Sequence, residues 1–301
     1  MKRFLKRRAQ SLANPLYRTR EAYEAAMRDY DAALATLTVP YESRYVATRH
    51  GFTHVLVTGT SGQPPVVLWH GMNVNLTMWC ALMEELAADY HLFAVDTIGN
   101  QGRSAPTRPN KRSPAHAEWA LDVMDGLGLL QAHCVGFSQG GWLIFRLAEA
   151  DAERVASAVL LSCAGLVPVD YRLLLRMAPA LLYRTSEARA RAIIRLTSAP
   201  HHHPTPYEVR VFMSLQTYRI EGRVPVLKDA QILRLQCPTC LIMGAQDRTF
   251  DARRAVERFS RLLPHGEVAL LEGLSHGLEE DRPRVYARVR AFLDRHARGH
   301  G

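Results

Sequence analysis

The feature that most constrains the fold of this chain is the alternation of short apolar runs with longer segments of helical periodicity. Buried strands are predicted at residues 66–71, 91–96, 132–138, 155–163, 237–244 and 267–273, with helices at 77–90, 115–129, 139–150, 251–263 and 279–296. Strands that alternate with helices need right-handed crossovers, which produce a mostly parallel sheet with helices on both faces. An α/β fold is therefore expected.

Two departures from this alternation indicate the domain organisation. Residues 165–235 are helix-rich, with Arg/Leu periodicity, and interrupt the pattern as an insertion. Residues 1–40 form a basic leader with one amphipathic helix, in which Tyr23, Met27 and Tyr30 recur at helical spacing. The core is thus expected at 41–164 and 236–301, and its first strands at 44–48 and 53–59 are predicted to form a hairpin.

Charge and composition exclude several classes of protein. The net charge of +9 is concentrated in residues 1–20 and 171–195, and no nucleic-acid-binding motif accompanies these stretches, so no nucleic-acid partner is expected. No apolar stretch reaches the roughly 18 residues of a membrane span, and the basic start lacks the apolar centre of a secretory signal. We expect a cytoplasmic protein with no integral membrane segment. The oligomeric state is left open.

Two short motifs have a plainer interpretation than the one they first suggest. The five cysteines are an odd number, which argues against a disulfide framework. The C-x-x-C pair Cys237 and Cys240 begins a predicted buried strand, which favours a structural role over a redox role. The triplet His201–His203 lies among prolines in a polar loop, and three adjacent histidines cannot all face one metal. No metal site is predicted.

The stretch "HCVGFSQGGWL" carries the strongest chemical signal. It places Ser138 between Gly136 and Gly140, after a predicted strand and before a predicted helix. In that context G-x-S-x-G is typical of a nucleophile on a strained corner, where small neighbours make room and the helix N-terminus faces a developing anion. Ser138 is therefore the candidate nucleophile.

A serine nucleophile needs a base and a group that orients the base. On this kind of sheet the expected chain order is serine, acid, histidine. Asp247 follows one late strand and His276 follows the next, so both should lie at the same sheet edge as Ser138. Asp96 precedes the nucleophile in the chain and is expected to fix the loop "DTIGNQGRS" rather than to act as the acid.

An oxyanion hole would complete this site. One donor is expected to be the backbone N–H of Gln139, the residue after the nucleophile. The second should come from the loop after the strand "VVLWHG", which makes Met72 the candidate and Asn73 the next choice. His70 is interpreted as structural.

Together, "HGMN", "DTIGNQGRS", "GFSQGG", "GAQD" and "LSHG" resemble the α/β-hydrolases, in particular capped, esterase-like bacterial hydrolases and carboxylesterases, over residues 41–298. The resemblance implies an eight-stranded core, a helical cap at 165–235 and no cofactor. It argues against haloalkane dehalogenases and epoxide hydrolases, which use aspartate where this chain has Ser138. It does not separate ester hydrolysis from thioester or carbon–carbon bond hydrolysis.

The expected function is hydrolysis of a small to medium carboxylic ester through an acyl-enzyme. A non-catalytic binding protein of the same fold is the alternative from another class, although such proteins usually lack a triad member. The substrate is expected to be neutral and lipophilic, because the spacing of the cap arginines suggests an outward solvated face. Those arginines are Arg172, Arg176, Arg184, Arg189, Arg191 and Arg195. The cap's apolar residues are expected mainly to pack on one another: Leu173, Leu174, Met177, Leu181, Phe212 and Met213.

Overall fold

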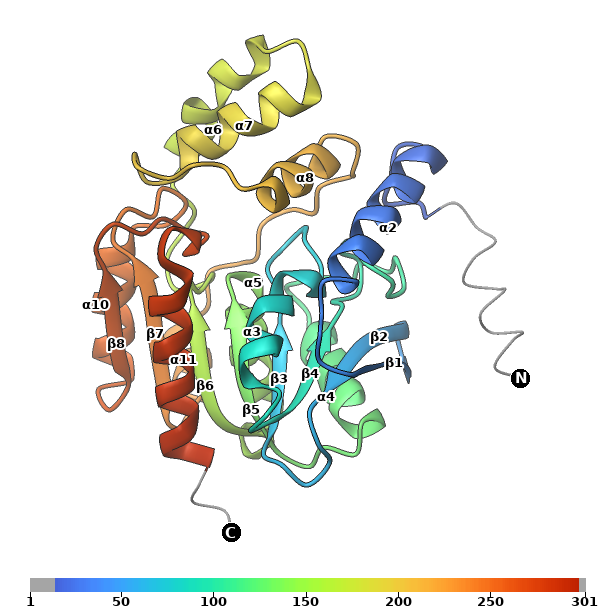
Figure 1. Cartoon of the computed structure of the whole chain (residues 1–301). Coiled ribbons are helices and arrows are strands. Elements are labelled where there is room, and N and C mark those ends of the chain that lie inside the picture. The colour runs from blue at the N-terminus through green and yellow to red at the C-terminus, as the bar shows by residue number, and fades with distance from the viewer. Residues whose placement is uncertain (1–13, 298–301) are drawn as a thin grey trace, which may run out of the picture.

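The centre of the molecule is one sheet of eight strands in the order β1-β2-β4-β3-β5-β6-β7-β8 (Figure 1). The computed structural model describes residues 14–297, so the first part of the basic leader lies outside the described residues. The strands are β1 Tyr41–Thr48, β2 Gly51–Thr58, β3 Pro65–Trp69, β4 His91–Val95, β5 Ala132–Phe137, β6 Val155–Leu161, β7 Thr239–Gly244 and β8 Glu267–Leu271.

The sheet has two kinds of pairing. β1 and β2 form an antiparallel hairpin, and β2 pairs antiparallel with β4. From β4 through β3 to β8 every pair is parallel, which confirms the expectation of a mostly parallel α/β sheet. The carboxyl ends of β3 to β8 therefore meet at one edge, which is where ligands bind in folds of this kind.

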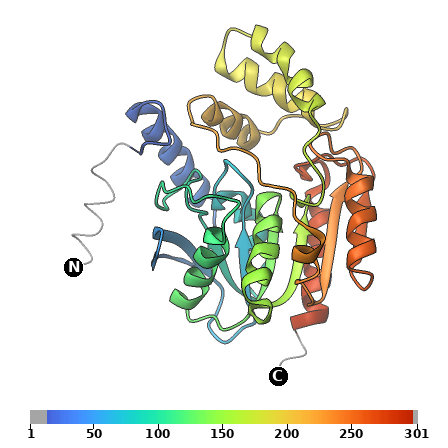
Figure 2. The same cartoon turned by 180° about the vertical axis from the view of Figure 1, so that it is seen from behind.

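Helices cover both faces of the sheet (Figures 1 and 2). One apolar cluster joins the sheet to α4, α5 and α10, and a second joins its other face to α3 and α11. These helices are α3 Cys80–Leu86, α4 Ala115–Gly126, α5 Gln139–Ala150, α10 Ala252–Leu262 and α11 Arg282–Ala297. Among the described residues, no helix is long and apolar enough to cross a membrane.

The predicted insertion contains a separate group of helices above the carboxyl ends of the strands (Figure 1). They are α6 Arg172–Met177, α7 Ser186–Thr197 and α8 Pro206–Leu215, followed by the short α9 Asp229–Ile232 beside the core. The helix-rich stretch after Tyr171 does not form one continuous helix: α6 ends before a 3-10 turn, Ala178–Leu182. Pro179 lacks the N–H that would continue an α-helix.

The details of this insertion correct one expectation about its apolar residues. Leu181 is 73% exposed and does not pack inside a cap core, while Phe212 and Met213 do pack on the small apolar cluster between α7 and α8. The side chain of Leu174 lies outside the described part of the structure.

The arginines of the insertion are not one solvated face. Arg176 pairs with Asp170, and half-buried Arg189 donates to the side chain of Gln216. Arg191 is also half-buried and pairs with Glu187. The expectation that the arginines face solvent holds for the exposed residues Arg172, Arg184 and Arg195. Spacing along the sequence did not reveal the partners that neighbouring segments supply.

The amphipathic helix of the leader is present as α2, Arg20–Leu34. Thr19 caps it by accepting from the N–H of Ala22, as helix N-termini require. Its buried face carries Ala26, Tyr30 and Leu34. The segment just before it pairs with the segment after α8 through Tyr17 and Tyr218, so the leader is anchored against the insertion.

Candidate active site

Ser138 occupies the corner between β5 and α5, as the G-x-S-x-G pattern predicts. Its backbone is left-handed, with φ of 50° and ψ of −108°. A non-glycine residue in such a conformation is strained, and the surrounding structure has to hold it. The N–H of Ser138 donates to the carbonyl of Leu161 (2.8 Å), and its carbonyl accepts from the N–H of Ala164 (3.1 Å). Strand β6 and the residues that directly follow it therefore hold the backbone of Ser138 in place.

The two flanking glycines are required by close backbone approach. A Cβ on Gly140 would lie 1.9 Å from the carbonyl oxygen of Trp69, and a Cβ on Gly136 would lie 2.5 Å from the backbone of Gly140. No side chain fits in either place. The motif thus packs strand β5, strand β3 and helix α5 at one point, with the serine at the tip.

A continuous hydrogen-bonded chain runs from Ser138 through His276 to Asp247. His276 Nε2 lies 3.2 Å from Ser138 Oγ, and His276 Nδ1 lies 2.8 Å from Asp247 Oδ2. The Asp247 side chain is fully buried, whereas that of His276 is 22% exposed. The structure brings these three predicted residues together from the ends of β5, β7 and β8.

Local hydrogen bonds hold the acid. The second oxygen of Asp247, Oδ1, accepts from the N–H groups of Thr249 (2.6 Å) and Phe250 (3.1 Å). One carboxylate oxygen is thus committed to the loop and the other to His276, which fixes the carboxylate plane. Because Nδ1 faces a carboxylate, it carries the ring proton, and Nε2 is left to accept from the serine hydroxyl.

Two aromatic side chains that the sequence analysis did not single out flank the histidine. The ring centroids of Phe137 and Phe250 lie 5.3 Å and 5.2 Å from that of His276. Phe137 directly precedes Ser138 and Phe250 follows Asp247 by three residues, which is the only local signal for them. They hold the imidazole in place without competing for its nitrogens.

Asn100 connects the two segments from which the oxyanion donors are predicted. Its Oδ1 accepts from the N–H of Asn73 (2.6 Å), and its Nδ2 donates to Gln139 Oε1 (3.4 Å). The N–H of Asn73 is thus already engaged, which favours Met72 over Asn73 as the second donor. Gln139 begins helix α5, where the first N–H groups have no acceptor within the helix.

Asp96 and His70 make structural contacts. His70 is fully buried and its Nε2 accepts from the N–H of Thr97 (2.9 Å). Asp96 accepts from the N–H groups of Leu76 (3.0 Å) and Arg103 (3.0 Å), so it joins two loops and is not the partner of His276.

The helical insertion contacts the loops that carry the acid and the histidine. Arg248, next to Asp247, donates to the carbonyl of Leu196 at the end of α7 (2.7 Å). The N–H of Ala199 donates to Glu280, which follows the His276 loop (3.3 Å). The insertion therefore rests on the same sheet edge as Ser138.

A cavity of about 480 Å³ lies close to the Met72 loop. It is lined by residues 108–112 and 221–225, which include four basic side chains and one acid. Lys111 pairs with the acid, Glu221 (3.0 Å), and its ammonium also reaches Met72 Sδ (3.4 Å). Arg112 and Arg223 are exposed, and neither has an ion-pair partner within residues 14–297.

The other two motifs make local contacts. His202 Nε2 lies 2.8 Å from Glu208, which also completes the N-terminal capping box of α8 with Thr205. Cys240 lies in β7, and burial raises the pKa of its thiol to about 12, which disfavours the reactive thiolate.

A sheet of this topology, with a serine, a histidine and an aspartate joined by hydrogen bonds at its carboxyl edge, is typical of the α/β-hydrolases. Comparison with known families gives the same fold. The family described as "alpha/beta hydrolase fold" matches residues 64–202. The match and the topology of the sheet show that the chain has the α/β-hydrolase fold.

More specific similarity is to bacterial carboxylesterases. The chain is 28% identical over 275 residues to an uncharacterised carboxylesterase, nap, of Bacillus subtilis, covering 88% of this chain and 91% of that one. The solved structure of the B. subtilis carboxylesterase CesB (YbfK) superposes with a TM-score of 0.80 at 27% identity, covering 91% of this chain and 98% of that one. The B. subtilis naproxen esterase gives a TM-score of 0.76 at 25% identity, covering 89% and 97%.

Proposed function

We propose that this chain is a serine carboxylesterase that works through an acyl-enzyme. The observation that carries the proposal is the hydrogen-bonded chain from Ser138 through His276 to buried Asp247. The similarity to carboxylesterases over nearly the full length supports the same reaction class.

In the proposed reaction, Ser138 Oγ attacks the ester carbonyl carbon while His276 Nε2 takes the hydroxyl proton. Asp247 keeps the imidazole oriented and stabilises the imidazolium. The oxyanion of the tetrahedral intermediate is stabilised by the N–H groups of Gln139 and Met72. His276 then donates the proton to the leaving alcohol, and water, activated by the same histidine, releases the carboxylic acid.

The test is a panel of p-nitrophenyl esters of rising chain length, with a matched thioester, combined with labelling by a fluorophosphonate. We expect turnover of the esters and a stoichiometric label on the peptide that contains Ser138. A folded wild-type protein that neither hydrolyses any ester nor carries the label at Ser138 would favour a binding protein of this fold.

The substrate's chemical character has two candidates. A neutral lipophilic ester is favoured by the two apolar side chains beside His276, which are Phe137 and Phe250. An ester with a carboxylate on one arm is favoured by a different observation, the basic cavity that reaches Met72 through Lys111.

A direct comparison separates these candidates. Monoesters of dicarboxylic acids should have a lower KM than neutral esters of equal length if the cavity binds the anion. Arg112→Ala and Arg223→Ala should then raise that KM and leave neutral esters unaffected, and added salt should weaken the preference. Equal KM values for both classes would support the neutral ester.

A further inference from the structure

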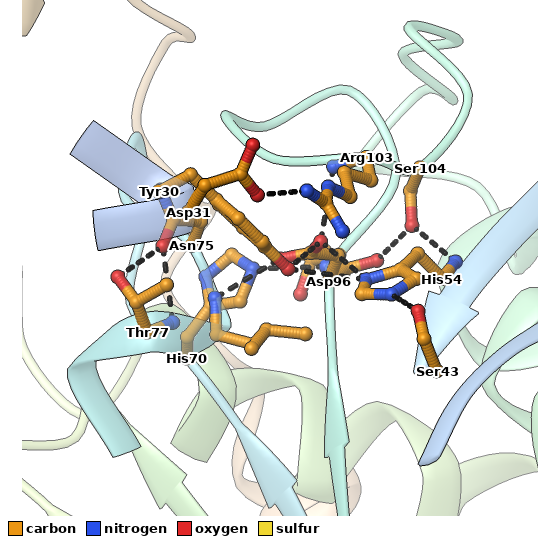
Figure 3. A network of polar contacts seen from close by, with 12 residues as sticks. Tyr30, Asp31, Ser43, His54, His70, Asn75, Thr77, Asp96, Arg103 and Ser104 are labelled. Carbon is orange, nitrogen blue, oxygen red and sulfur yellow. Dashed lines mark hydrogen bonds and ion pairs between the residues drawn. The ribbon is translucent and has the colours of Figure 1, made fainter. Parts of the chain in front are cut away.

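A second serine–histidine–aspartate chain joins β1, β2 and the loop after β4, and it shares no residue with the proposed active site (Figure 3). Ser43 Oγ lies 2.5 Å from His54 Nε2, and His54 Nδ1 lies 3.0 Å from Asp96 Oδ2. The same atoms are joined in the same order as in Ser138, His276 and Asp247. The proposed esterase mechanism does not use Ser43, His54 or Asp96 as a reacting group.

The position of each member comes from strand register. His54 pairs with Tyr45 in the β1–β2 hairpin, so Ser43, two residues away on β1, lies diagonally opposite His54 on the same face. Asp96 follows β4, the other neighbour of β2, and its N–H donates to the carbonyl of His54 (2.9 Å). The N–H of His54 donates in turn to Ser104 Oγ (2.8 Å). The histidine is therefore held from both sides.

The hydrogen-bond partners of Asp96 and His54 indicate which nitrogen of the imidazole carries the proton. Asp96 is fully buried, which opposes ionisation, but the hydrogen bonds from His54 and Arg103 lower the pKa of Asp96 below its usual value. The hydroxyl of Tyr30 also donates to Asp96 Oδ2 (2.8 Å). With Asp96 a carboxylate, His54 carries its proton on Nδ1, and Nε2 accepts from the Ser43 hydroxyl.

Ser43 is open to solvent although His54 is not. β1 is the outermost strand of the sheet, and Ser43 is exposed on it. Tyr41 and Tyr45, two residues away on either side and on the same face, are 44% and 50% exposed. A small aromatic ester could contact these rings while its carbonyl approaches Ser43.

We propose that Ser43 is a second nucleophile, which accepts one acyl group from small activated aryl esters. Ser43 Oγ bonds to the carbonyl carbon, the bond between that carbon and the aryl oxygen breaks, and the aryl oxide leaves. The hydroxyl proton passes to His54 Nε2 and then to the aryl oxide. The products are acyl-Ser43 and the phenol.

This second site is expected to react once rather than to turn over. Ser43 lies within an extended strand, while Ser138 lies at the first turn of α5, where free N–H groups can stabilise an oxyanion. Loss of such donors slows each step that passes through a tetrahedral intermediate by about a hundredfold or more. Hydrolysis of acyl-Ser43 should therefore be slow.

The experiment uses the full chain with Ser138→Ala, so that the proposed active site cannot contribute. The protein is incubated with p-nitrophenyl acetate, and acetylated peptides are quantified by mass spectrometry over time. Ser61, also exposed, outside any helix and with no hydrogen bond to a histidine in residues 14–297, is the internal reference. Ser43 should be acetylated about a hundredfold faster than Ser61, at the lower end of what a positioned general base contributes.

The matched variant adds His54→Gln to Ser138→Ala, and circular dichroism checks that it folds. Acetylation of Ser43 should fall to the rate of Ser61 in this variant. Equal rates for Ser43 and Ser61 in the Ser138→Ala protein would overturn the proposal, whether or not the His54 variant folds. Unchanged labelling of Ser43 in a folded His54→Gln protein would overturn it as well. Neither result bears on ester turnover by Ser138.

Discussion

The two serine–histidine–aspartate chains of this molecule have nearly the same hydrogen bonds and different surroundings. In the first, the serine–histidine and histidine–aspartate distances are 3.2 Å and 2.8 Å; in the second they are 2.5 Å and 3.0 Å. Distances alone therefore do not distinguish an active site from a structural network. The backbone around each serine does.

Ser138 is held in a left-handed conformation at the start of a helix, between two glycines that admit no side chain. Ser43 lies in a regular strand of an antiparallel hairpin. A helix N-terminus directs several N–H groups at one point beside the Ser138 hydroxyl, whereas successive N–H groups of a strand point in opposite directions and do not converge. The difference lies in where an oxyanion could be stabilised.

The histidines differ in a second respect. The His276 side chain is 22% exposed between two phenylalanines, while that of His54 is fully buried beneath Tyr30 and beside Tyr45. His276 can exchange protons with a substrate and with water. His54 can exchange a proton only with groups that lie next to Ser43 Oγ, and it also joins the β1–β2 hairpin to Asp96.

The largest expected effect separates the two serines directly. Ser138→Ala should reduce kcat for p-nitrophenyl butyrate by about a millionfold, because the nucleophile is lost. Ser43→Ala should leave kcat within about twofold of wild type, because surface substitutions of this kind usually have small effects. Steady-state kinetics on both variants, with circular dichroism to check folding, measure this. Substantial turnover by folded Ser138→Ala would remove the basis for the comparison.

The corner itself is tested by Gly140→Ala. The added methyl would meet the Trp69 carbonyl at 1.9 Å, and the backbone must move to relieve the overlap. We expect a loss of about 3 kcal/mol or more in the free energy of unfolding, together with loss of activity. Gly222→Ala is the matched control, because a Cβ there meets nothing within 4 Å. Urea denaturation measures the free energy of unfolding of both variants. Equal stability of the two would contradict a tightly packed corner at Gly140.

A third histidine shows what burial does without a carboxylate. His116 is buried, and neither ring nitrogen has a hydrogen-bond partner within residues 14–297. Burial, with the charges of Lys111 and Arg146, lowers the pKa of His116 to about 4. The folded state favours neutral His116, so this contribution to stability is complete above pH 6.5 and is lost as the pH falls toward 4.

The measurement is the free energy of unfolding at pH 7.5 and at pH 4.5 for wild type and His116→Leu. Wild type should lose up to about 3 kcal/mol more than the variant over this range. Parallel pH profiles for the two proteins would show that His116 does not titrate as its burial predicts.

The smallest expected effect concerns the hydrogen bond from α2 to Asp96, the acid of the second serine–histidine–aspartate network. Tyr30→Phe removes the hydroxyl that donates to Asp96 and leaves the ring in place. Stability should fall by about 1.5 to 3 kcal/mol, the range for a hydrogen bond to a charged group. Activity at Ser138 should not change. Thermal unfolding and steady-state kinetics check both statements, and a large loss of activity would mean that the two chains are coupled through the Asp96 loop.

The sequence by itself determined the elements of the core and the order of the candidate triad. The strands at 66–71, 91–96 and 132–138 and the hairpin at 44–59 are present within a few residues of their predicted bounds. These signals are local: apolar runs, helical periodicity and glycine punctuation lie within a few residues of one another. Ser138, Asp247 and His276 each follow a strand, and the carboxyl ends of parallel strands must share one edge.

Only the tertiary structure decided which buried polar groups meet. Tyr30 has helical spacing in the leader and gives no sign in sequence of donating to Asp96, which is 66 residues away. Ser43 meets His54 only through hairpin register, and His54 meets Asp96 only because β2 pairs with β4. Register and the packing of α2 depend on many distant contacts at once, so no short stretch of sequence carries their signature.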